Sequence, residues 1–147
     1  MAKEKDYQWQ AVEVYPDCYV KIQDLANELC VPVSQAIENA LVYFQENKGN
    51  LEVNRLAKWF SDYCFLKDIG ASITQTGNRY PEMKKVNFRL TINTHGIFLK
   101  TWRESNLTKT VVFMRAVYMY WCSFPTNKAF AIEAQEKLAQ IKRLLNI

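Results

Sequence analysis

Polar side chains that can bind the edges of DNA bases occupy alternate positions in one short segment of this 147-residue chain, residues 85 to 92. The period of two predicts a β-strand with one buried face, whose apolar members are Val86, Phe88, Leu90 and Ile92. The other face would expose Lys85, Asn87, Arg89 and Thr91. An arginine can fork onto guanine O6 and N7, an asparagine can pair with adenine N6 and N7, and a lysine can reach a guanine or a flanking phosphate. Lys85, Asn87 and Arg89 thus have the chemistry to contact base edges in the major groove, but for this strand taken alone an ordinary exposed strand face is the favoured interpretation.

Charge is distributed unevenly along the chain, although the overall net charge is only +4. Residues 1 to 70 contain 7 Lys and Arg against 11 Asp and Glu, whereas residues 71 to 147 contain 12 against 4. Clustered cations favour a partner that carries phosphates, because they release condensed counterions when they meet a nucleic-acid backbone. The basic half is therefore the expected DNA-binding half. On charge alone, an accidental imbalance between two solvated surfaces is an equal alternative.

Two segments match in hydrophobic pattern when the chain is shifted against itself by 76 positions without a gap. The shift places Val12 on Phe88, Val14 on Leu90 and Ile22 on Phe98. It also aligns one face of a helix in each segment: Ala36, Ile37, Ala40, Leu41 and Phe44 with Val112, Phe113, Ala116, Val117 and Tyr120. Each copy is predicted to contain a strand (residues 10 to 15 and 85 to 92), a helix (17 to 29 and 94 to 104), a tight connection and a second helix.

The second copy resembles the ribbon-helix-helix DNA-binding proteins, the family that includes the Arc and methionine repressors. The resemblance is carried by Lys85-Val-Asn-Phe-Arg-Leu-Thr and by Asn106-Leu-Thr-Lys-Thr-Val-Val-Phe-Met-Arg-Ala-Val. The first copy, which ends in Glu28-Leu-Cys-Val-Pro-Val-Ser-Gln-Ala-Ile-Glu-Asn-Ala-Leu, resembles the family as well. The two matches together cover roughly half of the chain.

The resemblance implies both a fold and a set of DNA contacts. In this family two strands pair antiparallel into a ribbon that lies on four helices, and outward strand positions read bases; residue by residue, these are Lys85, Asn87 and Arg89. The start of the second helix clamps the DNA backbone in relatives, which implies phosphate contacts at Thr108, Lys109 and Thr110. Thr108 is also the expected N-cap of that helix, so that free backbone amides would face a phosphate.

The first copy departs from the family pattern at its expected DNA-binding positions. Its outward row would be Trp9, Ala11 and Glu13, and Glu13 occupies the position equivalent to Arg89. Pro32 replaces the capping Thr108. We expect this copy to retain the fold and to have lost most of its DNA contacts. Either the two copies pair within one chain, or second copies from two chains pair with each other; we favour the second arrangement, which would place six reading residues in one groove.

The fold class expected is therefore mainly α with short β-ribbon strands, a tandem ribbon-helix-helix with a linker helix and a C-terminal helix. The boundaries are a degenerate copy at 8–47, a linker helix and loop at 48–84, the DNA-binding copy at 85–124 and the C-terminal helix at 125–147. Within the linker, residues 51 to 66 predict an amphipathic helix, and 70 to 81 predict the longest loop. Thr126 is expected to cap the last helix.

Composition and spacing argue against several other classes of protein. The longest nearly apolar run, residues 111 to 124, is shorter than the roughly 20 residues that cross a bilayer. The charged N-terminus leads into no apolar stretch, so a cytoplasmic location without membrane contact is expected. The four cysteines are far apart in the sequence, and we expect them to be reduced and mainly packed in the core. A zinc site built from these distant positions is the minor alternative. His95 stands alone near a helix start, and no catalytic constellation is visible, so no enzyme, metal or cofactor is expected.

The function expected from these observations is sequence-specific binding to double-stranded DNA, as a homodimeric transcriptional repressor. In that assembly the acidic N-terminal half would be free to dimerise or to bind a protein partner. The alternative function is a protein-interaction or assembly module that uses the same fold without specific DNA binding.

Overall fold

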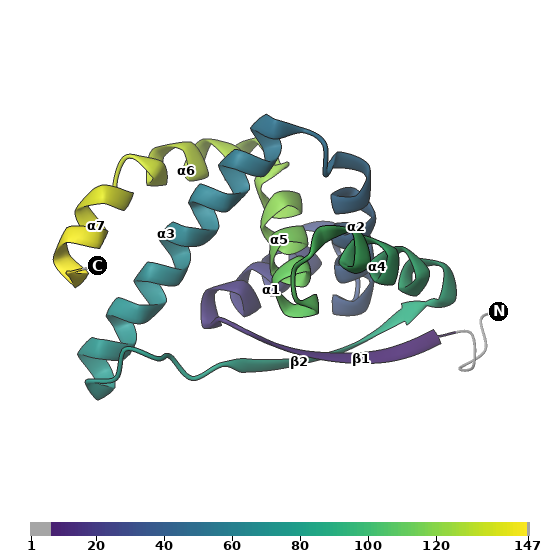
Figure 1. Ribbon diagram of the computed structural model, residues 1–147, viewed down its shortest axis with the longest axis horizontal. Helices are drawn as coiled ribbons and strands as arrows, with labels where there is room; N and C mark the ends of the chain where they lie inside the picture. The colour runs from purple at the N-terminus through teal and green to yellow at the C-terminus, as the bar shows by residue number, and fades with distance from the viewer. Residues whose placement is uncertain (1–6, 147) are drawn as a thin grey trace.

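A computed structural model describes residues 7 to 146 of the chain, which are mainly helical and contain one two-stranded antiparallel sheet (Figure 1). The first half contributes β1 (Tyr7–Val14), α1 (Pro16–Leu29), α2 (Val33–Asn47) and the long α3 (Leu51–Thr76). The second half contributes β2 (Lys84–Thr91), α4 (Ile92–Ser105), α5 (Lys109–Cys122), α6 (Pro125–Gln135) and α7 (Leu138–Leu145). None of the described helices is both long and apolar enough to cross a membrane.

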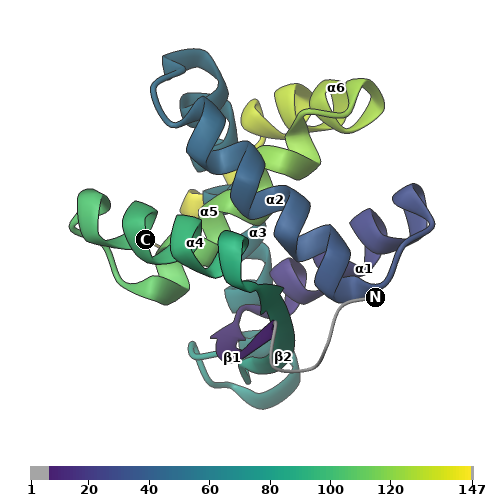
Figure 2. The same cartoon turned by 90° about the vertical axis from the view of Figure 1, so that its right-hand side faces the viewer.

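Strands β1 and β2 pair with each other within the chain, and we call this pair the ribbon. The register runs from Tyr7 opposite Thr91 to Val14 opposite Lys84. In Figure 1 the helices lie on one side of the ribbon, and the end-on view of Figure 2 shows it below α2 and α4. The arrangement that we favoured from the sequence, with ribbons formed between second copies of two chains, is therefore wrong for this structure. Both arrangements satisfy the same backbone hydrogen bonds, so the sequence pattern did not distinguish them.

The alternation predicted for β2 is present up to its last residue. Val86, Phe88 and Leu90 are buried, and the residues between them are exposed. Ile92, which was expected to point into the core, is 56% exposed and is the first residue of α4. The strand ends because Thr91 caps that helix, with its side chain accepting a hydrogen bond from the backbone N–H of Thr94. At this point the period changes from two to 3.6, so Ile92 leaves the strand's buried face.

Helices at equivalent positions of the two halves begin 76 residues apart. Helix α1 and helix α4 differ by 76 residues at both ends, and α2 and α5 also start 76 residues apart. Each of the first helices ends at a residue in the left-handed conformation, Cys30 with φ 55° and Asn106 with φ 58°. The order strand, helix, helix therefore occurs twice, with α3 between the two occurrences.

The hydrophobic core lies between the ribbon and the helices. The rings of Phe88 from β2 and Phe113 from α5 have centroids 5.0 Å apart, and both residues are fully buried. Ile37, Phe98 and Tyr118 complete the same core from α2, α4 and α5. Burying each such side chain contributes about 1.5–3 kcal/mol, so the apolar row of β2 fixes which face of the ribbon remains outside.

Helix α3 is longer than the sequence predicted. It continues through Gly70 to Thr76, so the expected loop over 70 to 81 is reduced to the residues after Gly77. Gly77, at φ 76°, ends the helix and donates its backbone N–H to the carbonyl of Ile73. Helix α7 packs beside Gly70, where a Cβ would lie in ordinary van der Waals contact with the Leu145 side chain, at 3.4 Å. Tertiary packing thus outweighs the low helix propensity of glycine.

The C-terminal segment forms two helices instead of the single helix expected for residues 125 to 147. The N-cap position of α6 is Phe124, which provides no side-chain cap, rather than Thr126, because Pro125 suits the first helical position and starts the helix earlier. The chain bends after α6, and α7 lies beside α3, as Figure 1 shows. Leu138 and Ile141 then pack against the core, and the Arg79 guanidinium donates to the carbonyl of Leu145 at 3.4 Å.

Candidate nucleic-acid interface

The side of the ribbon that faces away from the helices gathers the residues predicted to read bases. We call this side the ribbon face, and it is formed by Tyr7, Trp9, Ala11 and Glu13 of β1 with Lys85, Asn87, Arg89 and Thr91 of β2. Lys85, Asn87 and Arg89 are all exposed. Successive members of this row lie about 7 Å apart along the strand, because alternate residues share a face. The structure therefore brings the three candidate readers into one straight row.

Arg89 is held at both its backbone and its side chain. Its backbone N–H donates to Ser34 Oγ of α2 at 3.1 Å, and the next outward N–H, that of Thr91, donates to Glu38 Oε1. The guanidinium carbon of Arg89 lies 4.4 Å from the ring centroid of Tyr7, a cation–π contact. These contacts occupy the free edge of β2 and restrict the arginine before any ligand binds. Pre-organisation of this kind lowers the conformational entropy that binding would cost.

The sequence did not identify Tyr7, Ser34 or Glu38 as partners of the candidate site. Tyr7 continues the outward period of two that Trp9, Ala11 and Glu13 begin, so that alternation was the available signal. Ser34 and Glu38 lie 55 and 53 residues from their β2 partners and give no local signal.

The residues of the first strand occupy the ribbon face as the sequence predicted. Trp9 is 61% exposed and lies directly opposite Arg89, and Glu13 lies directly opposite Lys85. Ala11 lies opposite Asn87 at the centre of the row. The face thus combines the three candidate readers and Thr91 of β2 with two aromatic residues, one small residue and one acidic residue of β1.

The expected phosphate contacts lie at the start of α5. Thr108 is the N-cap, and its Oγ1 accepts a hydrogen bond from the backbone N–H of Val111 at 3.2 Å. Lys109 is half-buried, with its Nζ 4.8 Å from the centroid of the Trp102 ring, and Thr110 is also half-buried. Helix α5 packs against β1, and α2 packs against β2. The second helix of each half therefore lies against one strand of the ribbon. At α2 the N-cap is Pro32, which provides no side-chain cap.

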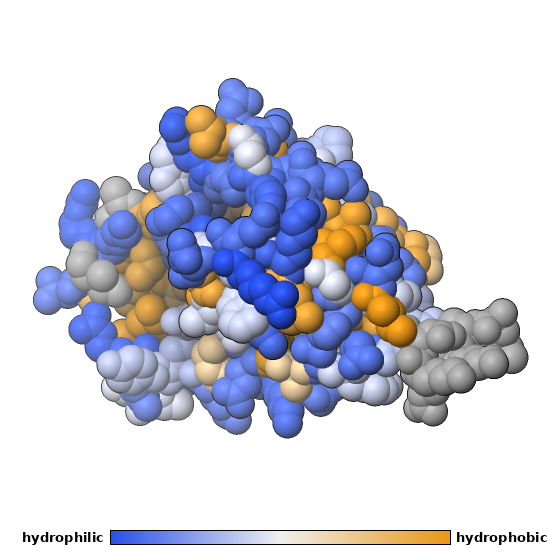
Figure 3. Space-filling view, turned by 45° about the vertical axis from the view of Figure 1, so that its right-hand side comes forward, coloured by the Kyte–Doolittle hydropathy of each residue, from blue (hydrophilic) through white to orange (hydrophobic). Residues whose placement is uncertain are grey.

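The ribbon face itself carries two cations and one acid, and the exposed Lys84 and Glu82 lie beside it. Lys84, Lys85 and Arg89 are exposed there, and Glu13 is the acid of the face itself. The carboxylate of Glu38, at the edge, accepts the N–H of Thr91. The lower margin of the molecule in Figure 3, where the ribbon lies, is mainly hydrophilic. Such a face suits a polyanionic partner.

A buried polar cluster joins α1, α3 and α5. Asp17 accepts hydrogen bonds from Lys21 Nζ at 3.1 Å and from the Tyr118 hydroxyl at 2.5 Å, and its own backbone N–H donates to Asp68 at 3.0 Å. Lys21 also lies 4.8 Å from the centroid of the Trp121 ring. Burial raises the pKa of Asp68 to about 6 and the pKa of Tyr118 above its usual range. The cluster fixes the start of α1 against α3 and α5.

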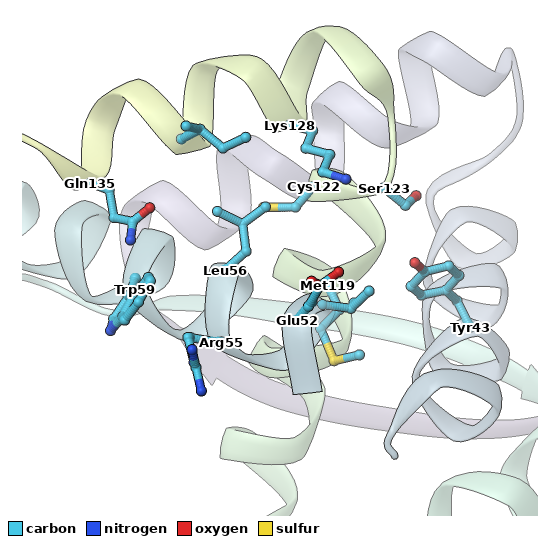
Figure 4. A pocket seen from close by; sticks show the side chains of 12 residues that line it. Tyr43, Glu52, Arg55, Leu56, Trp59, Met119, Cys122, Ser123, Lys128 and Gln135 are labelled. Atoms are coloured by element: carbon cyan, nitrogen blue, oxygen red, sulfur yellow. The ribbon is translucent and has the colours of Figure 1, made fainter. Parts of the chain in front are cut away.

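A pocket of about 360 Å³ lies at the other end of the helices, and none of its lining residues belongs to the ribbon (Figure 4). Its lining includes Leu56 and Trp59 of α3, Met119 and Cys122 of α5, and Lys128 of α6. Burial raises the pKa of Cys122 to about 12, so this thiol remains protonated and unreactive. The size and apolar lining suit a small molecule or an apolar side chain.

Cysteines and acids are not arranged for metal binding in the described part of the chain. Cys18, Cys64 and Cys122 are buried, Cys30 is exposed, and none of the four forms a disulfide. Within residues 7 to 146, no group of three or more His, Cys, Asp or Glu side chains could hold a metal ion. His95, in the first turns of α4, is half-buried.

Comparison of the chain with protein-family models, with curated proteins and with solved structures found no match.

Proposed function

We propose that this protein binds double-stranded DNA sequence-specifically by inserting the ribbon into the major groove, and that it acts as a transcriptional regulator, a repressor that occupies a promoter. The observation that carries the proposal is the row of Lys85, Asn87 and Arg89 on the ribbon face, backed by the buried row of Val86, Phe88 and Leu90. The major groove is wide enough for a two-stranded ribbon, and each base pair presents a distinct pattern of donors and acceptors there.

The arrangement of the strands and helices supports the interpretation of the chain as a tandem ribbon-helix-helix protein. Two strand-helix-helix segments, whose equivalent helices start 76 residues apart, supply one strand each to the ribbon and two helices each to its covered side. A single chain then provides what two chains provide in the ribbon-helix-helix family. A homodimer is not needed to complete the ribbon, so dimerisation would occur through other surfaces.

Each candidate residue has a distinct part in the proposed contact. Arg89 forks onto guanine O6 and N7, Asn87 pairs with adenine, and Lys85 reaches a guanine or a phosphate. Thr108, Lys109 and Thr110 place the start of α5 against a backbone phosphate, where the positive end of the helix dipole and the lysine both favour an anion. Base contacts would supply specificity, and phosphate contacts would set register and orientation.

The alternative function is an assembly module without specific DNA binding, and one observation favours it. Leu51, Trp59 and Ile132 are exposed apolar residues at or beside the pocket between α3, α5 and α6. Exposed apolar surface beside a pocket is typical of protein interaction sites. The ribbon face has no evident use in this alternative, and we therefore prefer DNA binding.

The proposal is tested by fluorescence anisotropy with labelled random-sequence duplexes at low salt, followed by selection of the tightest-binding duplex. We expect binding that weakens steeply as salt rises, because phosphate contacts release counterions. The triple variant Lys85→Ala, Asn87→Ala, Arg89→Ala should lose preference for the selected duplex. Arg103→Ala, which removes an exposed arginine of α4, is the matched control and should keep it. Absence of binding to any duplex at low salt would rule out DNA recognition.

A further inference from the structure

The two ends of the ribbon face carry different chemistry. The 76-residue shift exchanges Ala11 with Asn87, and these two residues are also strand partners, so they mark the centre of an approximate two-fold arrangement. At one end Trp9 is paired with Arg89, and at the other end Glu13 is paired with Lys85. In a true dimer these two ends would be identical.

The Trp9 end offers an apolar ring beside a guanidinium. Trp9 is 61% exposed although it lies in a strand, and Tyr7 and Arg89 are in contact beside it. An exposed apolar side chain in the major groove contacts the methyl group of thymine, and the arginine binds guanine. This end therefore suits neighbouring thymine and guanine bases.

The Glu13 end offers a carboxylate beside an ammonium. A carboxylate accepts a hydrogen bond from cytosine N4, and a lysine donates to guanine O6 or N7, so the pair matches the two bases of a C·G pair. Glu13 and Lys85 are both exposed, and within residues 7 to 146 neither forms an ion pair. Where the base opposite Glu13 has no donor, the carboxylate would be desolvated without a partner.

Resting on the proposed function, we infer that one chain recognises a non-palindromic DNA site and that Trp9 and Glu13 determine specificity together with the β2 readers. In this arrangement the Glu13 carboxylate discriminates between DNA sequences, in addition to repelling the DNA phosphates. The first strand contributes one base contact at each end of the ribbon, so β1 and β2 each read part of the site.

The experiment is selection of bound duplexes from a random library by the full chain, and by its Glu13→Gln and Trp9→Ala variants. We expect a motif without two-fold symmetry and one chain per selected duplex in analytical ultracentrifugation. Glu13→Gln should reduce the preference for cytosine at one position by about 10-fold or more and leave the other end unchanged. Trp9→Ala should relax the preference for thymine at the opposite end of the motif. Glu28→Gln, at an exposed position of α1, is the matched control and should leave the motif intact.

Two results would overturn the inference while leaving DNA binding in place. One is a palindromic motif bound by two chains, and the other is an unchanged base preference in both the Glu13→Gln and the Trp9→Ala variant. Failure of the wild-type protein to enrich any duplex, with no binding at low salt, would instead overturn the proposed function together with the inference.

Discussion

Ala11 lies directly opposite Asn87 in the ribbon, and their separation of 76 positions equals the interval between the starts of α1 and α4. The pair Ala11 and Asn87 therefore marks the centre of an approximate two-fold arrangement that relates both the two strands and the helices that follow them. Because each half supplies one strand, the ribbon closes within a single chain, and its two outward rows differ in sequence.

A disulfide between positions 11 and 87 should form within one chain. The backbone N–H groups of Arg89 and Thr91 point away from β1 and donate to side chains of α2. Asn87 lies two residues before Arg89, so its N–H points the same way, and Asn87 and Ala11 form a non-hydrogen-bonded pair of the ribbon. Such pairs have Cα atoms about 4.5 Å apart, within the range that a disulfide spans. Ala11→Cys with Asn87→Cys, in a Cys30→Ser background, should oxidise to a monomer on a non-reducing gel.

The matched control for this crosslink is Trp9→Cys with Asn87→Cys, a diagonal pair that is farther apart. It should oxidise much more slowly. A disulfide-linked dimer as the main product of the 11–87 variant would show that the strands pair between chains.

The ring of Tyr7 should strengthen DNA binding through Arg89. Tyr7→Leu removes the cation–π contact at 4.4 Å and frees the guanidinium, so affinity for the selected duplex should fall about 2- to 5-fold. In an Arg89→Ala background the same substitution should have little effect on affinity, because the guanidinium that the Tyr7 ring contacts is absent. Anisotropy titrations of the four proteins form a double-mutant cycle. Equal losses in both backgrounds would mean that Tyr7 acts independently of Arg89.

Lys109 should contribute affinity without sequence preference. Lys109→Ala removes one proposed phosphate contact, so binding should weaken to a similar degree on all duplexes, and the salt slope should decrease by about 1. Lys142→Ala, in α7 and away from the ribbon, is the matched control. A salt slope that is unchanged in Lys109→Ala would remove the start of α5 from the interface.

Asp68 should make the protein less stable as pH rises from about 4 to above 6. Burial raises the pKa of Asp68 from 3.8 to about 6, so the folded state binds the proton more tightly than the unfolded state does. This contribution to the free energy of unfolding is present below pH 4 and is lost as pH passes through 6. Asp68→Asn should remove the dependence and be more stable at pH 7 by about 1 kcal/mol, a value that allows for solvent screening. Urea unfolding at several pH values measures this effect.

The control for the pH dependence is Asp24→Asn, at an exposed position of α1. It should leave the curve of the wild-type protein unchanged. Identical pH dependence in the wild-type protein and in Asp68→Asn would assign the titration to other groups.

Periodicity allowed the ribbon face and most helices to be predicted from the sequence. The exposed positions of Lys85, Asn87 and Arg89 were predicted correctly because alternate burial in a strand leaves a regular pattern in the sequence. Thr108 was found as a helix cap because its hydroxyl and its position before an apolar run are a local signal, and the structure confirms that cap. The face of a helix or strand that is buried is thus the feature that can best be predicted from the sequence.

Other features depend on contacts between distant residues and could not be predicted in this way. Gly70 suggested a loop, but the packing of Leu145 beside it lets α3 continue. The partner of each strand, the support of Arg89 by Ser34, and the cluster around Asp17 join residues more than 50 positions apart. Ile92 was misplaced because it lies where a strand period gives way to a helix period.

Methylation interference on the selected duplex tests the central proposal most directly. Methylation of guanine N7 blocks the major-groove acceptor that Arg89 would use, so it should abolish binding of the wild-type protein at one or two guanines. In Arg89→Ala the sensitivity at one of those guanines should disappear, while the rest of the pattern remains. If N7 methylation affects neither protein at any guanine, the ribbon does not read the major groove through Arg89, and the account of this protein as a ribbon-reading DNA-binding protein is contradicted.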